Sequence, residues 1–273
     1  MSSLIDTGDL IQAENTATRI PVVLCLDVSY SMVDNGGFEA LNTGVEAFFE
    51  TCKKDSVNKY GFDVAIVTFG AEGVIKHQDF RPIWNQTDCP TFSFNKELLI
   101  NKDLWIDGTP MGRGVDLSMQ GLDIRKNEYK ENAIGYYQPW LVIITDGQPT
   151  DDGEFEGFPE DRRVADRLAY AETINSVLDL QKNKKLKVIA VGVGNEDYRK
   201  LSGFVIDNKV LTTKDFSEFD LVFEYLSKSM SAATGTNTVL ESEIEESPIA
   251  QIMEDLEDEG LSISIADFGR DED

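Results

Sequence analysis

Short, continuously apolar runs alternate with longer amphipathic stretches along the first 233 residues. The clearest runs, all rich in Val, Ile and Leu, are PVVLCLD (21–27), DVAIVTFG (63–70), WLVIITD (140–146) and LKVIAVGVG (186–194). A strand that lacks polar residues at alternate positions is buried on both faces, which is typical of a parallel sheet with helices on each side. The pattern therefore predicts an α/β fold with a doubly wound, mostly parallel sheet.

The stretches between the runs carry apolar residues at helical spacing. In 37–55, for example, Leu41, Val45 and Phe48 recur at three- and four-residue steps. By this pattern, helices are predicted over 37–55, 111–129, 161–181 and 215–233. Six phenylalanines at helix or strand spacing are predicted to pack in the core, namely Phe48, Phe49, Phe62, Phe69, Phe219 and Phe223.

Two further runs complete the predicted sheet. The more polar run 73–80 follows 63–70 closely enough to pair with it as an antiparallel hairpin, and 209–213 is a short strand. The sequence thus predicts a Rossmann-like sheet of six strands, with one antiparallel edge strand and helices on both faces.

Acidic residues are concentrated near the C-terminal end of the chain. The net charge is −25, from 50 acidic and 25 basic residues, and residues 234–273 hold thirteen of the acids against one arginine. The small-residue stretch ATGTNT marks the start of this part. We therefore expect an N-terminal extension (1–17), a folded domain (18–233) and an acidic tail (234–273).

The tail also carries two patterns of ordered structure. Ser247 and Pro248 can begin a helix whose apolar face is formed by Ile249, Ile252, Met253 and Leu256. The stretch LSISIADF (261–268) alternates apolar and polar residues, as a half-buried strand does. Such a helix and strand can pack on the parent domain or on a partner, and disorder is the alternative for the whole tail.

Charge and composition exclude several classes of partner and site. A strongly acidic chain repels nucleic-acid phosphates and anionic lipid surfaces. No apolar stretch approaches the roughly 20 residues of a transmembrane helix, and MSSLIDTGDLIQAEN lacks the pattern of a secretory signal, so a cytoplasmic location is expected. The three cysteines (Cys25, Cys52, Cys89) and the single histidine (His77) have neither the number nor the spacing for a disulfide framework or a zinc site.

Two predicted strands end in aspartate. Asp27 ends the first strand and is followed by Ser29 and Ser31, and Asp146 ends the run WLVIITD. In a parallel sheet these ends meet at one edge, where two carboxylates repel each other unless a cation lies between them. Carboxylate and hydroxyl oxygens are hard ligands that suit Mg²⁺. The residues therefore predict a divalent-cation site.

A third loop, DGTPMGRG (107–114), is expected at the same edge. Gly108 and Pro110 flank Thr109 and hold its hydroxyl on a tight turn before a helix. Other acids near these loops have simpler interpretations: solvated loop carboxylates for Asp34 and Asp107, and surface or capping residues for Asp151 and Asp152.

Taken together, these three motifs resemble the metal-ion-dependent adhesion site of von Willebrand factor A domains. The similarity extends over about residues 18–232. The phrases RIPVVLCLDVS, VEAFFE, AIVTFG, GTPMG, YYQPWLVIITDGQPTDD, NKKLKVIAVGVG and EYLSKSMS are similar to those of the bacterial tellurite-resistance-type subgroup. Three motifs in the order found in the family, each at the end of a predicted strand, are far more specific than any one of them.

The resemblance implies a role for each site residue. Ser29, Ser31 and Thr109 would hold Mg²⁺, with Mn²⁺ or Ca²⁺ as alternatives, while Asp27 and Asp146 would act mainly through bound water. One coordination position would stay open for an Asp or Glu of a partner protein. Tyr30 stands where many relatives have glycine, which makes the rim of the site bulkier.

The function expected from this resemblance is that of a metal-dependent protein-interaction module, a scaffold or adaptor in a bacterial stress response with kinase or phosphatase components as partners. No general base, nucleophile or phosphate-binding lysine accompanies the five residues, so the chain is expected not to be an enzyme. Two alternatives remain: a metal-dependent hydrolase or phosphotransferase, and a homo-oligomer subunit that associates through its tail. A tail carboxylate is also a candidate ligand for the metal of its own or a neighbouring molecule.

Overall fold

A seven-stranded mixed sheet forms the centre of the molecule. The computed structural model describes residues 17–34, 36–54, 56–70, 72–85, 108–194, 196–235 and 264–268. The strands lie in the order β3-β2-β1-β4-β5-β6-β7. Their bounds are β1 (Ile20–Val28), β2 (Phe62–Gly70), β3 (Gly73–Pro82), β4 (Trp140–Thr145), β5 (Lys187–Val193), β6 (Lys209–Thr213) and β7 (Ser264–Asp267).

The predicted fold class is confirmed, but the sheet differs from the prediction at one edge. The five central strands are parallel, and β3 pairs antiparallel with β2 as expected. A seventh strand, β7, pairs antiparallel with β6, so the sheet has seven strands instead of six and two antiparallel edges instead of one. This strand comes from the acidic tail, where the alternating pattern of 261–268 had predicted it; the tail helix predicted near Ile249 lies outside the described residues.

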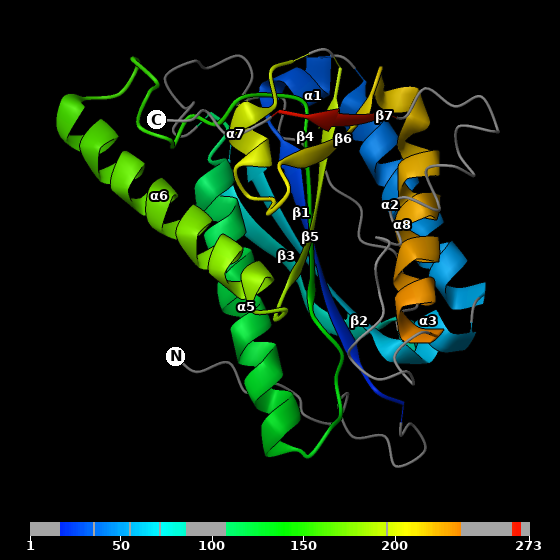
Figure 1. Ribbon diagram of the computed structural model, residues 1–273. Coiled ribbons are helices and arrows are strands. Elements are labelled where there is room, and N and C mark those ends of the chain that lie inside the picture. Colours follow the sequence, from blue (N-terminus) through cyan, green and yellow to red (C-terminus); the bar gives the residue numbers. More distant parts are fainter. Residues whose placement is uncertain are drawn as a thin grey trace.

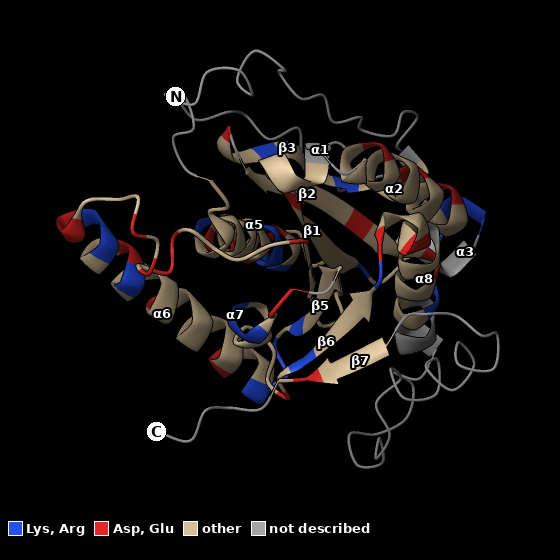
Figure 2. Ribbon diagram, turned by 90° about the horizontal axis from the view of Figure 1, so that it is seen from above, with Lys and Arg blue, Asp and Glu red and all other residues tan. Residues whose placement is uncertain are grey.

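Helices cover both faces of the sheet (Figures 1 and 2). On one face lie α5 (Met111–Glu131), α6 (Glu160–Lys182) and α7 (Arg199–Ser202), and on the other lie α2 (Gly37–Lys54), α3 (Ser56–Gly61) and α8 (Phe219–Gly235). The short helix α1 (Tyr30–Asp34) follows β1, the 3₁₀ turn η2 (Ile83–Asn85) follows β3, and the 3₁₀ turn η4 (Phe216–Glu218) directly precedes α8. In the part of the chain that the structure describes, no helix is long and apolar enough to cross a membrane.

Alternate residues of the strands belong to two hydrophobic cores, one on each face of the sheet. Val22, Leu24 and Leu26 of β1 pack with α2 and α8, whereas Val23 and Cys25 belong to the core beneath α5. This division explains why the strand sequences are apolar without interruption. All six phenylalanines predicted for the core are buried. Cys25 and Cys52 are buried and are not joined in a disulfide, and Cys89 lies outside the described residues.

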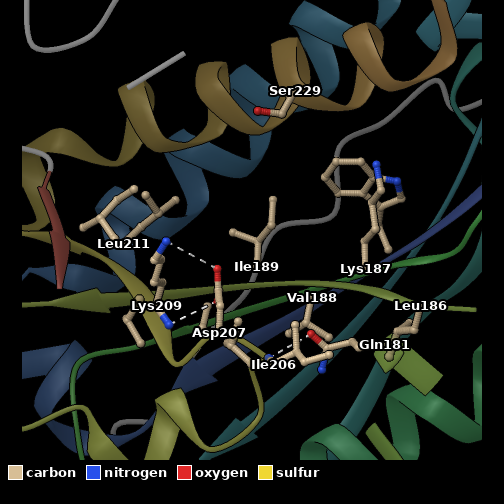
Figure 3. Close-up of a pocket in the computed structure, with 15 residues that line it drawn as sticks. Gln181, Leu186, Lys187, Val188, Ile189, Ile206, Asp207, Lys209, Leu211 and Ser229 are labelled. Atoms are coloured by element: carbon tan, nitrogen blue, oxygen red, sulfur yellow. Dashed lines mark hydrogen bonds and ion pairs between the residues drawn. The ribbon is translucent and has the colours of Figure 1, made fainter. Parts of the chain in front are cut away.

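An apolar hollow of about 230 Å³ lies between α8 and the strands β5 and β6 (Figure 3). It opens here because β6 pairs with β5 over Val191–Val193 and does not extend its pairing to Val188 and Ile189. Trp140, Ile189 and Leu211 contribute to its apolar wall. None of the five predicted metal ligands lines this hollow, so the hollow is separate from the predicted metal site.

A buried cluster of charged side chains is centred on Asp63, near the start of β2. Arg125 of α5 donates to Asp63 Oδ2 at 2.7 Å, and the Tyr129 hydroxyl donates to the same oxygen at 2.5 Å. The Arg19 guanidinium lies 3.7 Å from Asp63 Oδ1 and donates to the carbonyl of Tyr60 at 2.9 Å. Arg19, Asp63 and Arg125 are all almost completely shielded from solvent. The cluster therefore joins β2 and α5 to Arg19, the residue directly before β1.

Candidate metal centre

The carboxyl ends of β1 and β4 place Asp27 beside Thr145. The two strands are parallel and in register up to Leu26 and Ile144, so the next residue on each strand is adjacent to the other. The Thr145 hydroxyl donates to Asp27 Oδ2 at 2.5 Å, and the backbone N–H of Ser29 donates to Asp27 Oδ1 at 2.7 Å. Both oxygens of this fully buried carboxylate are thus oriented by neighbouring groups.

A chain of hydroxyl groups connects the end of β1 with Asp146. The Ser31 hydroxyl donates to Asp146 Oδ1 at 2.8 Å, and the hydroxyl oxygens of Ser29 and Ser31 are 3.0 Å apart. Because α1 begins directly after Ser29, its first turn brings Ser31 back over the end of the strand. Four of the five predicted ligands therefore share one hydrogen-bonded cluster.

Thr109 lies on a loop that is fastened to the turn after Asp146. The Thr109 N–H donates to the hydroxyl of Thr150 at 2.9 Å, and the Thr150 N–H donates to the carbonyl of Thr109 at 3.0 Å. Gly108 has a φ of +64°, and a Cβ at this position would lie 2.8 Å from the Thr150 side chain, so the turn requires glycine. The third loop is thus joined to the loop that carries Asp146, while a role of the Thr109 hydroxyl as a ligand stays a prediction.

The start of α5 is also anchored to this turn. Asp151 is buried and accepts hydrogen bonds from the N–H groups of Gly112 (3.1 Å) and Arg113 (2.8 Å), the second and third residues of the helix. It caps the helix from a distant part of the sequence. Asp152 is buried too and pairs with Lys200 at 3.1 Å. The capping interpretation of Asp151 is therefore confirmed, whereas a surface position is wrong for both aspartates.

The electrostatics of the cluster favour a bound cation. Burial, and next the charge of Asp146, raise the pKa of Asp27 to about 7. Burial also raises the pKa of Asp146. Among the residues that the structure describes, no lysine or arginine forms an ion pair with either carboxylate. Two buried carboxylates without a basic partner, surrounded by hydroxyl groups, fit the oxygen-rich surroundings that Mg²⁺ requires.

Sequence reasoning missed Thr145 and Thr150. Thr145 orients the Asp27 carboxylate, and Thr150 fixes the loop of Thr109. A signal was present, because Thr145 is a polar residue inside the otherwise apolar run WLVIIT. Asp107 and the side chain of Asp34, which were predicted to be solvated loop carboxylates, lie outside the described residues.

Gly70 is predicted to be essential for the shape of the Asp27–Ser31 turn. A Cβ at Gly70 would lie 2.5 Å from the carbonyl carbon and oxygen of Val28 and 2.7 Å from the nitrogen of Ser29, all of them main-chain atoms that cannot rotate away. We expect Gly70→Ala to lower the free energy of unfolding by about 1–3 kcal/mol, the usual cost of overpacking. It should also weaken Mg²⁺ binding, because the turn has to move.

Urea unfolding and calorimetric Mg²⁺ titration measure both effects. Gly121→Ala is the matched control, since a Cβ there would meet only Phe80, at an ordinary contact distance of 3.6 Å. Because Gly121 lies in the interior of α5, the free energy of unfolding of this control should rise by about 0.5–1 kcal/mol through the higher helix propensity of alanine. A Gly70→Ala protein with unchanged stability and unchanged Mg²⁺ affinity would contradict the steric argument.

Comparison with solved structures gives similarities of low sequence identity. Proximal thread matrix protein 1 from the mussel byssus, with zinc in its MIDAS motif, is 17% identical (TM-score 0.43; 80% of this chain and 49% of that chain covered). The pilus adhesin SpaC from Lactobacillus rhamnosus GG is 13% identical (TM-score 0.49; 78% and 31% covered). The vWF domain of the pilus tip protein Mfa5 from Porphyromonas gingivalis is 12% identical (TM-score 0.44; 84% and 98% covered). The chain thus spans about half the length of the mussel protein.

Family membership rests on a more direct comparison. No curated protein matches the sequence. The family model described as the von Willebrand factor type A domain matches residues 22–225, a range that begins in β1, ends in α8 and includes all the residues of the candidate metal centre. This match covers about three quarters of the chain. The chain therefore belongs to the von Willebrand factor type A domain family.

Proposed function

We propose that this chain binds protein partners through a divalent cation held by Ser29, Ser31 and Thr109, with Asp27 and Asp146 supporting the ion mainly through bound water. Members of the family generally mediate metal-dependent protein–protein interactions. The observation that carries the proposal is the cluster at the ends of β1 and β4, in which two buried carboxylates and two serine hydroxyls meet and, among the described residues, neither carboxylate forms an ion pair with lysine or arginine.

The composition of this ligand set favours an acidic group on the partner. Neutral hydroxyl ligands leave more positive charge on the ion than carboxylate ligands would, and Mg²⁺ accepts further oxygen ligands readily. An incoming Asp or Glu therefore gains a strong local contact even though the protein as a whole is negatively charged. Mg²⁺ is the proposed ion, with Mn²⁺ or Ca²⁺ as alternatives.

We further propose that the chain acts as a scaffold or adaptor, without enzymatic activity, in a bacterial stress response in the cytoplasm. The support is the resemblance of its motifs to the tellurite-resistance-type subgroup, in which kinase and phosphatase components are the expected partners. The acidic stretches of the tail that are candidate ligands for the metal, 254–259 and 271–273, lie outside the described residues.

Replacing both serines by alanine tests the metal centre. Ser29→Ala/Ser31→Ala removes two of the proposed direct ligands, so we expect the Mg²⁺ affinity to fall by at least about tenfold, as for other losses around metal sites. Isothermal titration calorimetry measures the affinity, and a pull-down in Mg²⁺ or chelator identifies the partners that depend on it. These partners should be absent from the pull-down with the variant.

Ser176→Ala, on the exposed side of α6, is the matched control and should bind Mg²⁺ and partners as the unaltered protein does. If the double variant kept full Mg²⁺ affinity and the same set of chelator-sensitive partners, the proposed function would be wrong.

A further inference from the structure

A second cavity shares a wall with the candidate metal centre. It has a volume of about 340 Å³ and lies where β5 and β6 end. Its lining consists of Ser31, Asp146, Val193, Gly194, Glu196, Lys214, Asp215 and Phe216. Because Ser31 and Asp146 belong to the metal cluster, a partner chain that reaches the ion passes the mouth of this cavity.

Contacts from several elements hold the walls of the cavity in place. The Gly194 N–H donates to the carbonyl of Thr213 at 2.8 Å, which joins the turns after β5 and β6. The Tyr198 hydroxyl donates to the carbonyl of Val193 at 2.6 Å, and the Tyr198 ring packs so closely on Gly192 that a Cβ there would lie 2.5 Å from it. The wall formed by β5 is therefore well supported.

Phe216 is the aromatic wall on the opposite side. Its ring leans against the start of α2, where a Cβ on Gly37 would lie 2.6 Å from ring atoms, and it stacks edge-on with Phe219 at 5.6 Å between ring centroids. The ring is only partly buried, so one part of it is available to a ligand. An aromatic face next to acidic groups suits the methylene stem and the charged end of a basic side chain.

The charged groups of the cavity also favour a cation. Glu196 is exposed, and its charge contributes to raising the pKa of Asp146, although burial of Asp146 is the larger cause. Asp215 caps η4 by accepting from the Ser217 N–H at 2.8 Å. With a divalent ion offset by Asp27 and Asp146, the remaining two acids outnumber Lys214. A partner carboxylate on the metal would add further negative charge beside them.

We propose, on the basis of the function above, that this cavity receives a Lys or Arg side chain that lies within a few residues of the metal-binding Asp or Glu of the partner. Glu196 pairs with the basic group, and Phe216 packs against its stem. The recognised motif is therefore an acidic residue with a basic neighbour, and the two contacts together select among the many exposed carboxylates that the metal alone would accept.

A peptide library displayed on phage tests the motif, because multivalent display compensates for weak single contacts. The library has one fixed Glu with three random residues on each side, is bound to the intact chain in Mg²⁺, and is released with chelator. We expect Lys and Arg to be enriched about threefold to fivefold among released peptides, as one partly exposed charge contact would give. Glu196→Gln should abolish the enrichment, and Glu196→Lys should replace it by enrichment of Asp and Glu.

Glu131→Gln, an exposed change of the same charge at the end of α5, is the control and should leave the enrichment unchanged. Chelator-released peptides with no excess of Lys or Arg would overturn the cavity proposal and leave the metal-dependent function intact. An excess of Lys or Arg that persists in Glu196→Gln would overturn the role of Glu196. A complete lack of chelator-released peptides, with the protein folded by circular dichroism, would overturn the proposed function itself.

Discussion

Replacing Asp63 by asparagine is expected to lower the free energy of unfolding by about 3–5 kcal/mol, the typical effect of removing one partner from a buried ion pair. Arg125, at 2.7 Å, and Arg19, at 3.7 Å, would both lose this carboxylate, and Glu128, which pairs with Arg125 at 3.0 Å, carries one negative charge against their two positive charges. The Tyr129 hydroxyl would at the same time lose the carboxylate that accepts its hydrogen bond.

The state of Arg125 shows how strongly the cluster depends on this carboxylate. Burial is the largest single effect and lowers the pKa of Arg125, but the charges of Asp63 and Tyr129 and their hydrogen bonds together raise the pKa overall. Asp63 therefore supplies a large part of the interaction that offsets the burial of the guanidinium, beside Glu128 at 3.0 Å. Since Asp63 lies on β2 and Arg125 on α5, the loss would loosen the contact between sheet and helix as well.

Urea unfolding, followed by circular dichroism, measures this effect. Asp79→Asn is the matched control, because Asp79 pairs with Lys76 at 2.7 Å on the exposed face of β3, where such pairs contribute about 0–1 kcal/mol. An Asp63→Asn protein no less stable than Asp79→Asn would show that the buried cluster contributes little. If Asp63→Asn fails to fold, Arg19→Met tests the same cluster through its more distant charge.

The fold could be predicted because its determinants are local. The runs that became β1, β2, β4 and β5 consist mostly of apolar residues, and this composition alone indicates burial on both faces. The edge formed by β7 was harder to assign. A short alternating pattern predicts a strand but does not say what it pairs with, and β6 offers only five residues, whose pairing with β7 depends on the whole sheet being formed.

The candidate site was predictable for a similar reason. Asp27 and Asp146 end parallel strands, and neighbouring parallel strands bring their carboxyl ends together, so four of the five predicted residues meet. The partners of those residues were not predictable. Thr145 of β4 donates a hydrogen bond to Asp27 of the neighbouring β1, and Arg125 donates to Asp63, which lies 62 positions earlier in the sequence. Such pairs depend on the relative placement of elements, which single-sequence patterns do not contain.

The substitution Asp146→Asn is expected to have opposite effects on stability without Mg²⁺ and with Mg²⁺. In chelator, two buried carboxylates lie close together without a cation, a repulsion that contributes to raising the pKa of Asp27 to about 7, although burial is its larger cause. Asp146→Asn removes one of these charges and keeps an oxygen to accept from Ser31, so the variant should be more stable than the unaltered protein without metal.

Addition of Mg²⁺ should reverse this order of stability. A ligand at about 100 times its Kd stabilises the folded state by about 2.7 kcal/mol, a gain that the unaltered protein should show and Asp146→Asn should lack. A chain of net charge −25 is also stabilised by the general screening that any added salt provides. Asp161→Asn, at an exposed position of α6, is therefore the control with the same change in charge. NaCl at equal ionic strength separates the effect of screening from that of Mg²⁺ binding. Urea unfolding of all three proteins, with chelator and with Mg²⁺, measures the effect. Equal Mg²⁺-induced gains in Asp146→Asn and Asp161→Asn would mean that the ion acts on the charge of the whole chain and does not occupy the site at the ends of β1 and β4.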